Sequence, residues 1–353
     1  MRALRWHNRR DVRLENVEDR PPGSNEVQID VETCGICGTD VEEYVSGPLV
    51  IPKEPHPLTG FCAPMIIGHE VAGRILRIGS DVRHLHPGQL VGVDGSFFCG
   101  TCQACARRQF NICEKWAFIG MSYPGGLAER MTVPSYMALP VSRDVPSEWV
   151  SLAEPVSVAV RAARRGRLAR GENVAILGGG TLGLAVLQVA RGLGARYVTV
   201  VEGIPFRRRI AWVLGADRVI SPDSTLNGQL REASQGQPDI IFDCTGSNES
   251  PAAAIEAVRL GGRVVLVGLP AKPTKFVFMQ IALREVELIG TLGHIFDEDY
   301  STALDLITSE QVNVEKLITH RLSLQDAVPK GLAALAENAV EDVLKIVITP
   351  GKV

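Results

Sequence analysis

Four cysteines form the densest cluster of metal-binding side chains in the sequence. Cys99, Cys102, Cys105 and Cys113 have the spacing Cys-x-x-Cys-x-x-Cys, followed by seven residues and a fourth cysteine. Thiolates spaced in this way on a loop can surround one tetrahedral zinc ion. The protein would then fill all four positions, so such a zinc has a structural role. An iron–sulfur cluster is the alternative for four cysteines, and four free surface thiols are the alternative without a metal.

A more dispersed set of side chains could form a second, catalytic metal site. Cys37, His69 and Glu154 carry groups that are competent zinc ligands, and Glu70 directly follows His69. Three protein ligands would leave a fourth position open for water or substrate, as catalytic zinc requires. Spacing alone does not separate this site from a histidine with a structural role. Cys34 and Cys37 could instead form a redox pair, although no thioredoxin-like strand and helix surround them.

The stretch from 174 to 202 contains the pattern of a dinucleotide-binding site. A short apolar run of the buried-strand type leads into a glycine motif, a small-residue helix and a second strand. Glycine permits the tight turn at position 178, the approach of a pyrophosphate at 180 and close helix packing at 183. The first amides of the helix would bind the phosphates. The predicted cofactor contacts at this turn are Gly178, Gly180, Thr181, Leu182 and Gly183.

Glu202 indicates which dinucleotide the pattern binds. It lies 24 residues after the first glycine, where a carboxylate accepts hydrogen bonds from the ribose hydroxyls of NAD. Its charge would repel the additional phosphate of NADP. Arg207, Arg208 and Arg209 follow and could tolerate that phosphate, although such arginines are more often a solvated helix start. We therefore expect NAD rather than NADP. A glycine-rich turn without a ligand is the alternative.

Length and composition describe an ordinary globular protein of about two domains. The chain has 353 residues, of which 45% are apolar and 22% charged, and its net charge of −3 gives no reason to expect nucleic-acid binding. No signal-peptide core follows the basic N-terminus. The longest uncharged run, 174 to 190, is broken by glycines, so we expect no membrane span. Eight cysteines spaced for metal rather than disulfides suggest a reducing, cytoplasmic setting.

Two patterns of secondary structure would position these residues. Residues 1 to about 150 are rich in Pro, Gly and short β-type runs, which predict a small, mostly antiparallel β domain. Strands alternate with helices in the second half, which predicts an α/β unit with a parallel, doubly wound sheet. The predicted strands are 27–31, 71–76 and 90–93 in the first half, and 174–177, 196–201, 217–220, 239–243, 263–268 and 286–290 in the second.

Several motifs together resemble one protein family. They are Cys34 to Asp40, Gly68-His69-Glu70, the four-cysteine loop, Gly125 to Glu129, Glu154-Pro155 and the glycine motif. A chain with all of them resembles the zinc-dependent medium-chain alcohol and polyol dehydrogenases over essentially its whole length. Within that family, segments 47–52 and 54–60 resemble the 2,3-butanediol dehydrogenase branch, which is close to the sorbitol and threonine dehydrogenases.

The resemblance implies an organisation of the chain. A Rossmann domain that binds NAD, residues 154–294, would be inserted into a GroES-like catalytic domain built from residues 1–153 and 295–353. The last strand of the Rossmann sheet would extend that sheet across a dimer interface. We therefore expect a homo-tetramer or a dimer.

The resemblance also implies roles for individual residues. Cys37, His69 and Glu154 would hold the catalytic zinc, and Glu70 beside it could exchange as a ligand. With the four-cysteine site, the chain would bind two zinc ions. Thr39 would hydrogen-bond the substrate oxygen, and Asp40 would orient His69.

Three further positions follow from the same resemblance. Thr245 and Gly246 match the segment that lines the nicotinamide ribose. Glu42 is a departure, because the family usually has a histidine there that passes the proton to solvent. A carboxylate can relay a proton with a different pH dependence, or the relay can run through water. Arg161 is a second departure, because the butanediol branch often has histidine there.

The reaction that the resemblance implies is the reversible NAD-dependent oxidation of a secondary alcohol to a ketone. The sequence does not choose among 2,3-butanediol, sorbitol-like polyols, threonine and a cyclic alcohol. A zinc-free enone or quinone reductase and a non-catalytic nucleotide-binding redox sensor are the rival interpretations. The set of Cys37, His69 and Glu154 argues against the reductase, and a sensor would have no need of Cys37, Thr39 and His69 together. The expected partners are a small alcohol and its ketone, without nucleic acid or membrane.

Overall fold

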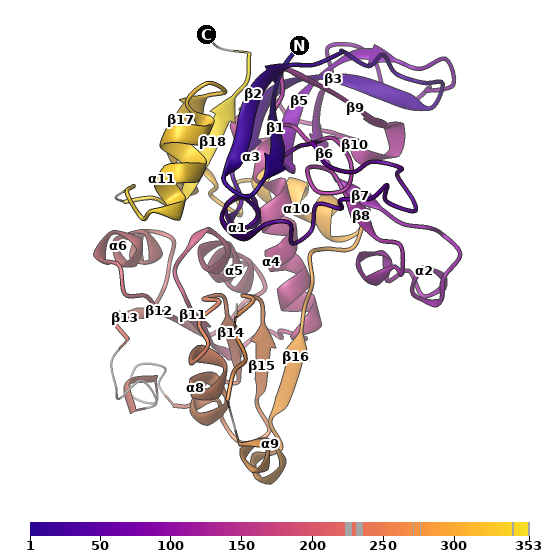
Figure 1. The fold of residues 1–353 in the computed structure, drawn as a ribbon. Coiled ribbons are helices and arrows are strands. Elements are labelled where there is room, and N and C mark those ends of the chain that lie inside the picture. The colour runs from indigo at the N-terminus through magenta and orange to yellow at the C-terminus, as the bar shows by residue number, and fades with distance from the viewer. Residues whose placement is uncertain (223–227, 231–235, 271, 276, 341, 352–353) are drawn as a thin grey trace. The chain divides into compact units, whose positions relative to one another are not determined.

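The structure, a computed structural model, describes residues 1–222, 228–230, 236–270, 272–275, 277–340 and 342–351. It divides the chain into two compact units (Figure 1). Unit 1 comprises Met1–Glu154, Ile295–Thr308 and Ile318–Val353, and unit 2 comprises Pro155–His294 and Ser309–Leu317. Unit 1 is therefore discontinuous in sequence. Among the described residues, no helix has the length and hydropathy needed to cross a membrane.

The main sheet of unit 1 is mostly antiparallel and is built around one long strand, β3 (Glu26–Gly35). This strand pairs with β5, β9 and β18, all antiparallel, whereas β17 pairs with β18 in parallel. The sheet order is β10-β6-β5-β3-β18-β17, with β9 also on β3. The remaining bounds are β5 (Glu70–Ile78), β6 (Leu90–Val93), β9 (Arg130–Pro134), β10 (Ala138–Pro140), β17 (Ile318–Ser323) and β18 (Lys345–Thr349).

Smaller elements complete unit 1. Two more sheets have the orders β2-β1-β4 and β7-β8. The apolar side chains of the sheets and of α1 form one core that includes Trp6, Ile29, Ile75 and Leu127. The bounds are β1 (Arg2–Asn8), β2 (Asp11–Asn16), β4 (Met65–Ile66), β7 (Ser96–Phe97), β8 (Ala117–Phe118), α1 (Gly38–Ser46), α2 (Gln103–Ala106), α3 (Ser147–Ser151), α10 (Asp299–Thr308) and α11 (Ala333–Ala336).

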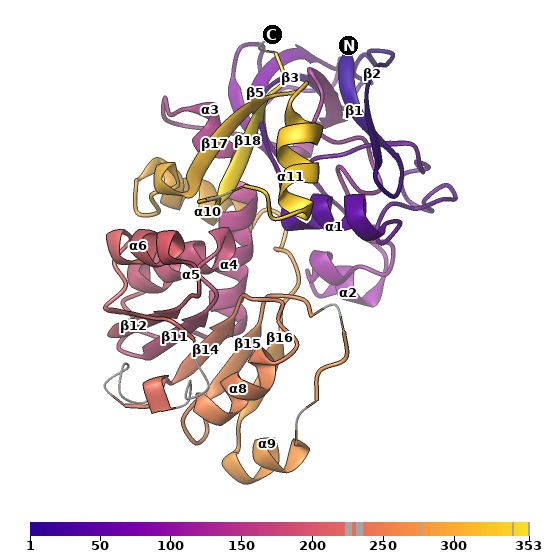
Figure 2. The same cartoon turned by 60° about the vertical axis from the view of Figure 1, so that its left-hand side comes forward.

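Unit 2 contains a parallel sheet with the strand order β13-β12-β11-β14-β15-β16 (Figure 2). The order reverses direction between β11 and β14, which is where doubly wound sheets bind nucleotides. The predicted α/β class and doubly wound sheet are thus confirmed. The bounds are α4 (Ala153–Arg165), β11 (Asn173–Leu177), α5 (Thr181–Gly192), β12 (Tyr197–Val201), α6 (Pro205–Val213), β13 (Arg218–Ile220), β14 (Ile240–Asp243), α8 (Ser250–Ala257), β15 (Arg263–Leu266), α9 (Phe278–Arg284) and β16 (Glu287–Gly290).

Alternation along β11 explains why helices cover both faces of this sheet. Ala175 and Leu177 pack into a buried cluster with residues of α8. Ile176 points to the other face, where its side chain lies beside Gly183 of α5. A strand buried on both faces reads as the continuous apolar run found in the sequence.

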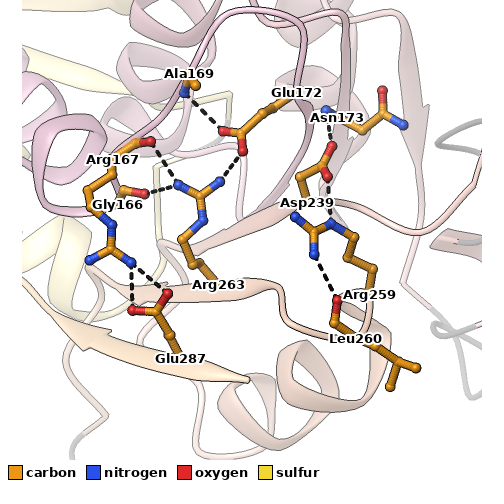
Figure 3. A network of polar contacts seen from close by, with 10 residues as sticks. All are labelled: Gly166, Arg167, Ala169, Glu172, Asn173, Asp239, Arg259, Leu260, Arg263 and Glu287. Carbon is orange, nitrogen blue, oxygen red and sulfur yellow. Dashed lines mark hydrogen bonds and ion pairs between the residues drawn. The ribbon is translucent and has the colours of Figure 1, made fainter. Parts of the chain in front are cut away.

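A polar network ties together the amino ends of four strands of this sheet (Figure 3). Arg263, at the start of β15, donates to the carbonyl oxygens of Gly166 and Arg167 and pairs with Glu172. Asp239, just before β14, accepts from the Asn173 amide at 2.8 Å and pairs with Arg259 at 2.6 Å. Because these contacts lie at the amino ends of the strands, whereas doubly wound sheets bind ligands at the carboxyl ends, we assign them to stability rather than to binding.

Candidate functional site

Cys37 is placed by the first turn of α1. The residue is the N-cap of this helix, and the Asp40 carboxylate accepts a hydrogen bond from the Cys37 amide at 2.9 Å. This capping arrangement satisfies an amide that would otherwise lack a partner at the helix start. It also fixes the Cys37 sulfur relative to the next residues of the helix. The Thr39 hydroxyl oxygen lies 3.7 Å from that sulfur.

Asp40 also contacts the second candidate ligand. Its other carboxylate oxygen lies 3.4 Å from Nδ1 of His69, and both side chains are almost fully buried. Burial opposes a charge on the His69 ring, but Asp40 and Cys37 outweigh it and raise the pKa of His69 well above its usual value. One carboxylate therefore contacts both the cysteine and the histidine, and its charge favours a positive charge on the His69 ring.

Glu70 begins β5 and lies opposite Gly35 of β3. A Cβ at position 35 would meet Oε2 of Glu70 at 1.9 Å, so only glycine leaves room for this carboxylate. Oε2 is fully buried and has no hydrogen-bond partner among the described residues. A buried carboxylate oxygen in this state needs a cation or a donor nearby.

Lys345 supplies one such cation and was missed in the sequence. It is the first residue of β18, which lies on the other side of β3, and its ammonium group pairs with Oε1 of Glu70. It also donates to the Ile36 carbonyl oxygen at 2.9 Å. Burial alone would lower the pKa of Lys345, but Glu70, Cys37 and Glu154 together outweigh it and raise that pKa. A lysine that opens an otherwise apolar strand was the signal available in the sequence.

The side chains of Cys37, His69 and Glu70 form a donor set suited to zinc. The ligand atoms of Cys37, His69 and Glu70 all lie within 4.8 Å of one another. Sulfur, nitrogen and carboxylate oxygen in a group of three leave one coordination position open. The unpartnered Glu70 oxygen and the positive charge favoured at His69 both fit a metal cation here.

The other predicted residues of this site lie nearby in sequence or structure. Glu154 is buried and contributes to the raised pKa of Lys345, but its carboxylate is outside the group of three ligand atoms. Glu42 is exposed on α1, and partial desolvation raises the pKa of its carboxyl. Cys34 is fully buried, and burial raises the pKa of its thiol.

An aromatic wall adjoins His69. The Phe118 ring packs edge-on against the imidazole, with centroids 5.8 Å apart. Trp116, which is half-buried, stacks on Phe118 at 5.5 Å. Such a wall offers apolar contact to a small substrate beside the candidate metal.

The four predicted cysteines converge on one point. Their ligand atoms lie within 4.8 Å of one another, and the sulfur pairs Cys99–Cys105 and Cys102–Cys113 are each 3.9 Å apart. Two zinc–sulfur bonds of about 2.3 Å at a tetrahedral angle separate their sulfurs by about 3.8 Å. Hydrogen bonds from Thr101 lower the pKa of Cys99 to about 6. These distances fit a structural zinc.

The nucleotide pattern surrounds a cavity of about 650 Å³ within unit 2. Its lining comes from residues at or beyond the carboxyl ends of β11, β12, β13 and β14, as expected for a doubly wound sheet. Gly178 adopts φ +93° at the start of the turn, a conformation that favours glycine. The predicted residues that line the cavity are Gly178, Gly180, Glu202, Arg207 and Thr245. Thr181, Leu182, Gly183 and Gly246 adjoin these residues in the chain but are not part of the lining.

Glu202 has a second role that the sequence did not indicate. Its two carboxylate oxygens accept hydrogen bonds from the Gly179 amide at 2.7 Å and the Ile204 amide at 2.8 Å. The acid therefore also anchors the glycine turn. Arg208 donates to the carbonyl oxygens of Glu202 and Gly203, so backbone contacts already engage one of the three arginines that could have held a phosphate.

Comparison with known proteins finds relatives of both units. Residues 23–143 match the alcohol dehydrogenase GroES-like domain family, and residues 181–309 match the zinc-binding dehydrogenase family. The chain is 30% identical to the (R,R)-butanediol dehydrogenase of Bacillus subtilis, over 99% of this chain and 100% of the relative. It is 31% identical to the sorbitol dehydrogenase of Homo sapiens, over 92% of this chain and 90% of the relative.

Solved structures agree with these matches. The crystal structure of 2R,3R-butanediol dehydrogenase from Bacillus subtilis has a TM-score of 0.92 at 30% identity, with 99% of both chains covered. A structure described as a zinc-binding dehydrogenase from Sinorhizobium meliloti 1021, bound to NADP, has a TM-score of 0.89 at 27% identity, again with 99% of both chains covered.

The two candidate metal sites predict different consequences of cysteine substitution. We expect Cys37→Ser to lose one of two zinc ions and to lower alcohol oxidation by at least about a thousandfold, because the metal contributes several kcal/mol to the reaction. Its melting temperature should change little. Cys102→Ser is the matched control: it should also lose one zinc, but its main effect should be a lower melting temperature.

Elemental analysis and thermal melting of the purified variants measure these effects. Full zinc content with full activity in Cys37→Ser would remove Cys37 from the ligand set. Unchanged zinc content and melting in Cys102→Ser would do the same for the four-cysteine site.

Proposed function

Because the chain belongs to the zinc-dependent medium-chain alcohol dehydrogenases, we propose that it oxidises a secondary alcohol of a small diol to the ketone, with NAD as the oxidant. The convergence of Cys37, His69 and Glu70 carries this proposal. A zinc-free reductase or a nucleotide sensor would not need three such ligands around a buried point. The cavity with Glu202 in its lining supports a nicotinamide dinucleotide as the oxidant.

The residues around Cys37 have separate tasks in this reaction. The zinc, when bound by Cys37, His69 and Glu70, supplies a Lewis acid that lowers the pKa of the substrate hydroxyl. Asp40 holds the His69 ring and the Cys37 amide in place. Lys345 compensates the charge of Glu70 from the side away from the unpartnered oxygen. Glu154 remains an alternative ligand that could replace Glu70.

Thr39 and Glu42 form the proposed route for the proton. The Thr39 hydroxyl, close to the Cys37 sulfur, accepts the substrate proton at Oγ1 and releases its own proton toward Glu42. Glu42 lies one helical turn further along α1 and is exposed, so it can transfer the proton to solvent. The raised pKa of Glu42 brings its carboxyl closer to the range in which a general base works best.

Relatives guide the choice of substrate class. The chain is similar to an (R,R)-butanediol dehydrogenase over its full length and in its fold. It is also similar to a sorbitol dehydrogenase. Both relatives are named for substrates with neighbouring hydroxyl groups. The aromatic wall of Trp116 and Phe118 favours the smaller, more apolar diol. We therefore place 2,3-butanediol ahead of sorbitol.

The residues of this chain support NAD as the nucleotide. One relative was solved with NADP, so the family alone does not decide between the two. Glu202 lies on the pocket wall where the adenosine ribose binds in this fold, and its carboxylate would repel a 2′-phosphate. Arg208 is held by backbone carbonyl oxygens on the same segment.

We also propose that two copies of the chain associate through the β16 edge of the unit 2 sheet. β16 pairs only with β15 among the described strands, so its outer edge offers backbone hydrogen-bonding groups. Val277, Phe278, Met279 and Leu283, on or next to α9, are all more than half exposed. An open edge and an apolar patch together favour self-association.

Sedimentation velocity should show that the wild-type protein forms at least a dimer and that the double variant Phe278→Asp/Leu283→Asp weakens this association. A wild-type monomer would contradict this proposal.

NADH formation tests the reaction directly. Zinc-replete protein should oxidise one isomer of 2,3-butanediol in preference to sorbitol, xylitol and L-threonine, each assayed with NAD and with NADP. The expected result is strong turnover of a single butanediol isomer with NAD. Preference for sorbitol would move the enzyme to the polyol branch, and no turnover of any diol would overturn the proposed substrate class.

The same assay across pH tests Glu42. If Glu42 accepts the proton, oxidation falls as pH drops through its raised pKa, because only the carboxylate accepts. Glu42→His should move this acid limb up to about pH 6.5. Glu42→Gln should slow oxidation by about tenfold, with partial recovery in imidazole buffer. An unaltered profile in both variants would assign the relay to water.

Glu202→Ala should weaken the binding of both NAD and NADP, and it should weaken the binding of NAD more. Loss of the two amide contacts loosens the glycine turn for either nucleotide, whereas loss of the charge helps only NADP. We expect the ratio of kcat/KM for NAD to that for NADP to fall by about tenfold or more, the contribution of hydrogen bonds to a charged acceptor. A constant ratio would remove Glu202 from the ribose site.

A further inference from the structure

One wall of the nucleotide cavity carries hydroxyl and carboxylate side chains but no side-chain N–H group among its described residues. The wall consists of the lining residues that follow β14, and its polar side chains are Thr245, Ser247, Glu249, Ser250 and Glu256. Only Thr245 among them was expected from the sequence to contact the cofactor, at the nicotinamide ribose. The carboxylates can only accept hydrogen bonds, and the thiol of Cys244, which also lines the cavity after β14, is a weak donor. The three hydroxyls therefore decide whether this wall offers a strong donor.

Asp243, behind the wall, takes up two of the three hydroxyl protons. This carboxylate is 2% exposed and does not line the cavity. Oδ1 accepts from the Thr245 hydroxyl at 2.8 Å, and Oδ2 accepts from the Ser250 hydroxyl at 2.6 Å. The two hydroxyl oxygens are 2.7 Å apart. Each hydroxyl has one proton, so the Thr245 proton is confined to the triangle formed with Asp243, and the Ser250 proton to that triangle or to the more distant Ser247 carbonyl oxygen at 3.2 Å.

The third hydroxyl is engaged in the same way. Ser247 donates its proton to Oε2 of Glu249 at 2.7 Å. The Asp243 carbonyl oxygen also accepts from the Val267 and Gly268 amides, which fixes the start of this segment. Glu256 accepts from the Gln280 amide at 3.4 Å. Apart from the weak donor of the Cys244 thiol, the polar side chains of the wall therefore present acceptors. We name this surface, defined by Thr245, Ser247, Glu249, Ser250 and Glu256, the acceptor wall.

The geometry of the fold leaves the adenine base beside the acceptor wall. The pyrophosphate binds at the glycine turn, and the adenosine ribose binds at Glu202. Outside the glycine turn and the strand end that carries Glu202, the cavity is lined by the acceptor wall, with Cys244 and Ala253 beside it, and by Arg207, Pro222 and Gly228. Because Thr245 is expected beside the nicotinamide ribose, we place the base attached to the adenosine ribose in the part of this lining that carries Glu249 and Glu256. Adenine carries one exocyclic hydrogen-bond donor, its 6-amino group.

We propose that the acceptor wall reads the 6-amino group of adenine through Glu249 and Glu256, and thereby selects NAD over the hypoxanthine dinucleotide. This inference rests on the nucleotide-binding function proposed above. Hypoxanthine has a carbonyl oxygen in place of the amino group, so an acceptor would face an acceptor. Asp243 is a positioning residue for this selection, because it keeps the protons of Thr245 and Ser250 out of the cavity.

Titration calorimetry with NAD and with nicotinamide hypoxanthine dinucleotide tests the proposal without catalysis. The wild-type protein should bind NAD about tenfold more tightly, as expected for one hydrogen bond to a charged acceptor. Glu249→Gln/Glu256→Gln should bring the two dissociation constants within about twofold, because a glutamine amide can donate to the hypoxanthine oxygen. Asp243→Asn should also bring the dissociation constants of the two dinucleotides closer together, since it frees a hydroxyl proton.

The matched control is Glu310→Gln/Glu337→Gln, which makes the same change of net charge at two exposed glutamates outside the cavity. This control should keep the wild-type ratio. Equal affinity of the wild-type protein for both dinucleotides, or an unchanged ratio in both the Glu249/Glu256 and Asp243 variants, would overturn the proposal. Failure of both dinucleotides to bind would instead contradict the proposed cofactor itself.

Discussion

Charged side chains buried together are stable only where their charges compensate one another, and this constraint governs the site around Cys37. Asp40, His69, Glu70 and Lys345 are each no more than 5% exposed. Lys345 compensates one oxygen of Glu70, and the other oxygen has no partner among the described residues. Asp40 and Cys37 favour positive charge at His69. The divalent metal that we propose at Cys37, His69 and Glu70 would place a further positive charge next to the unpartnered oxygen of Glu70.

The fold meets this constraint with segments that are far apart in sequence. β3 ends beside the site, with Glu70 of β5 on one side and Lys345 of β18 on the other. α1 follows β3 directly and brings Cys37 and Asp40 to the same point. The chain therefore leaves unit 1, builds the whole nucleotide-binding sheet and returns before the metal site is complete. The C-terminal segment contributes to the site itself and does not merely cover it.

Motifs with a local mechanism were recognised from the sequence. The four-cysteine spacing and the glycine turn each act within a few residues, and the structure brings together the cysteines and places the glycines at a nucleotide cavity. The predicted family and the doubly wound sheet are confirmed by the relatives and by the strand order. These features depend on chain-local geometry, which spacing describes well.

Contacts between distant segments could not be predicted from the spacing of residues in the sequence. Lys345 lies 275 positions from Glu70, and nothing in its own surroundings in the sequence identifies its partner. Asp243 looks like the last residue of a strand, and its control of Thr245 and Ser250 follows only from their orientation. The second role of Glu202, as an anchor of the glycine turn, depends equally on a backbone contact across two strands.

The metal content of the native protein tests the central claim most directly. Elemental analysis of protein purified without chelators should find two zinc ions per chain, one at the four cysteines and one at Cys37, His69 and Glu70. Only one zinc per chain, with the four-cysteine site filled, would contradict the account of the buried charges around Cys37 and the catalytic role built on it.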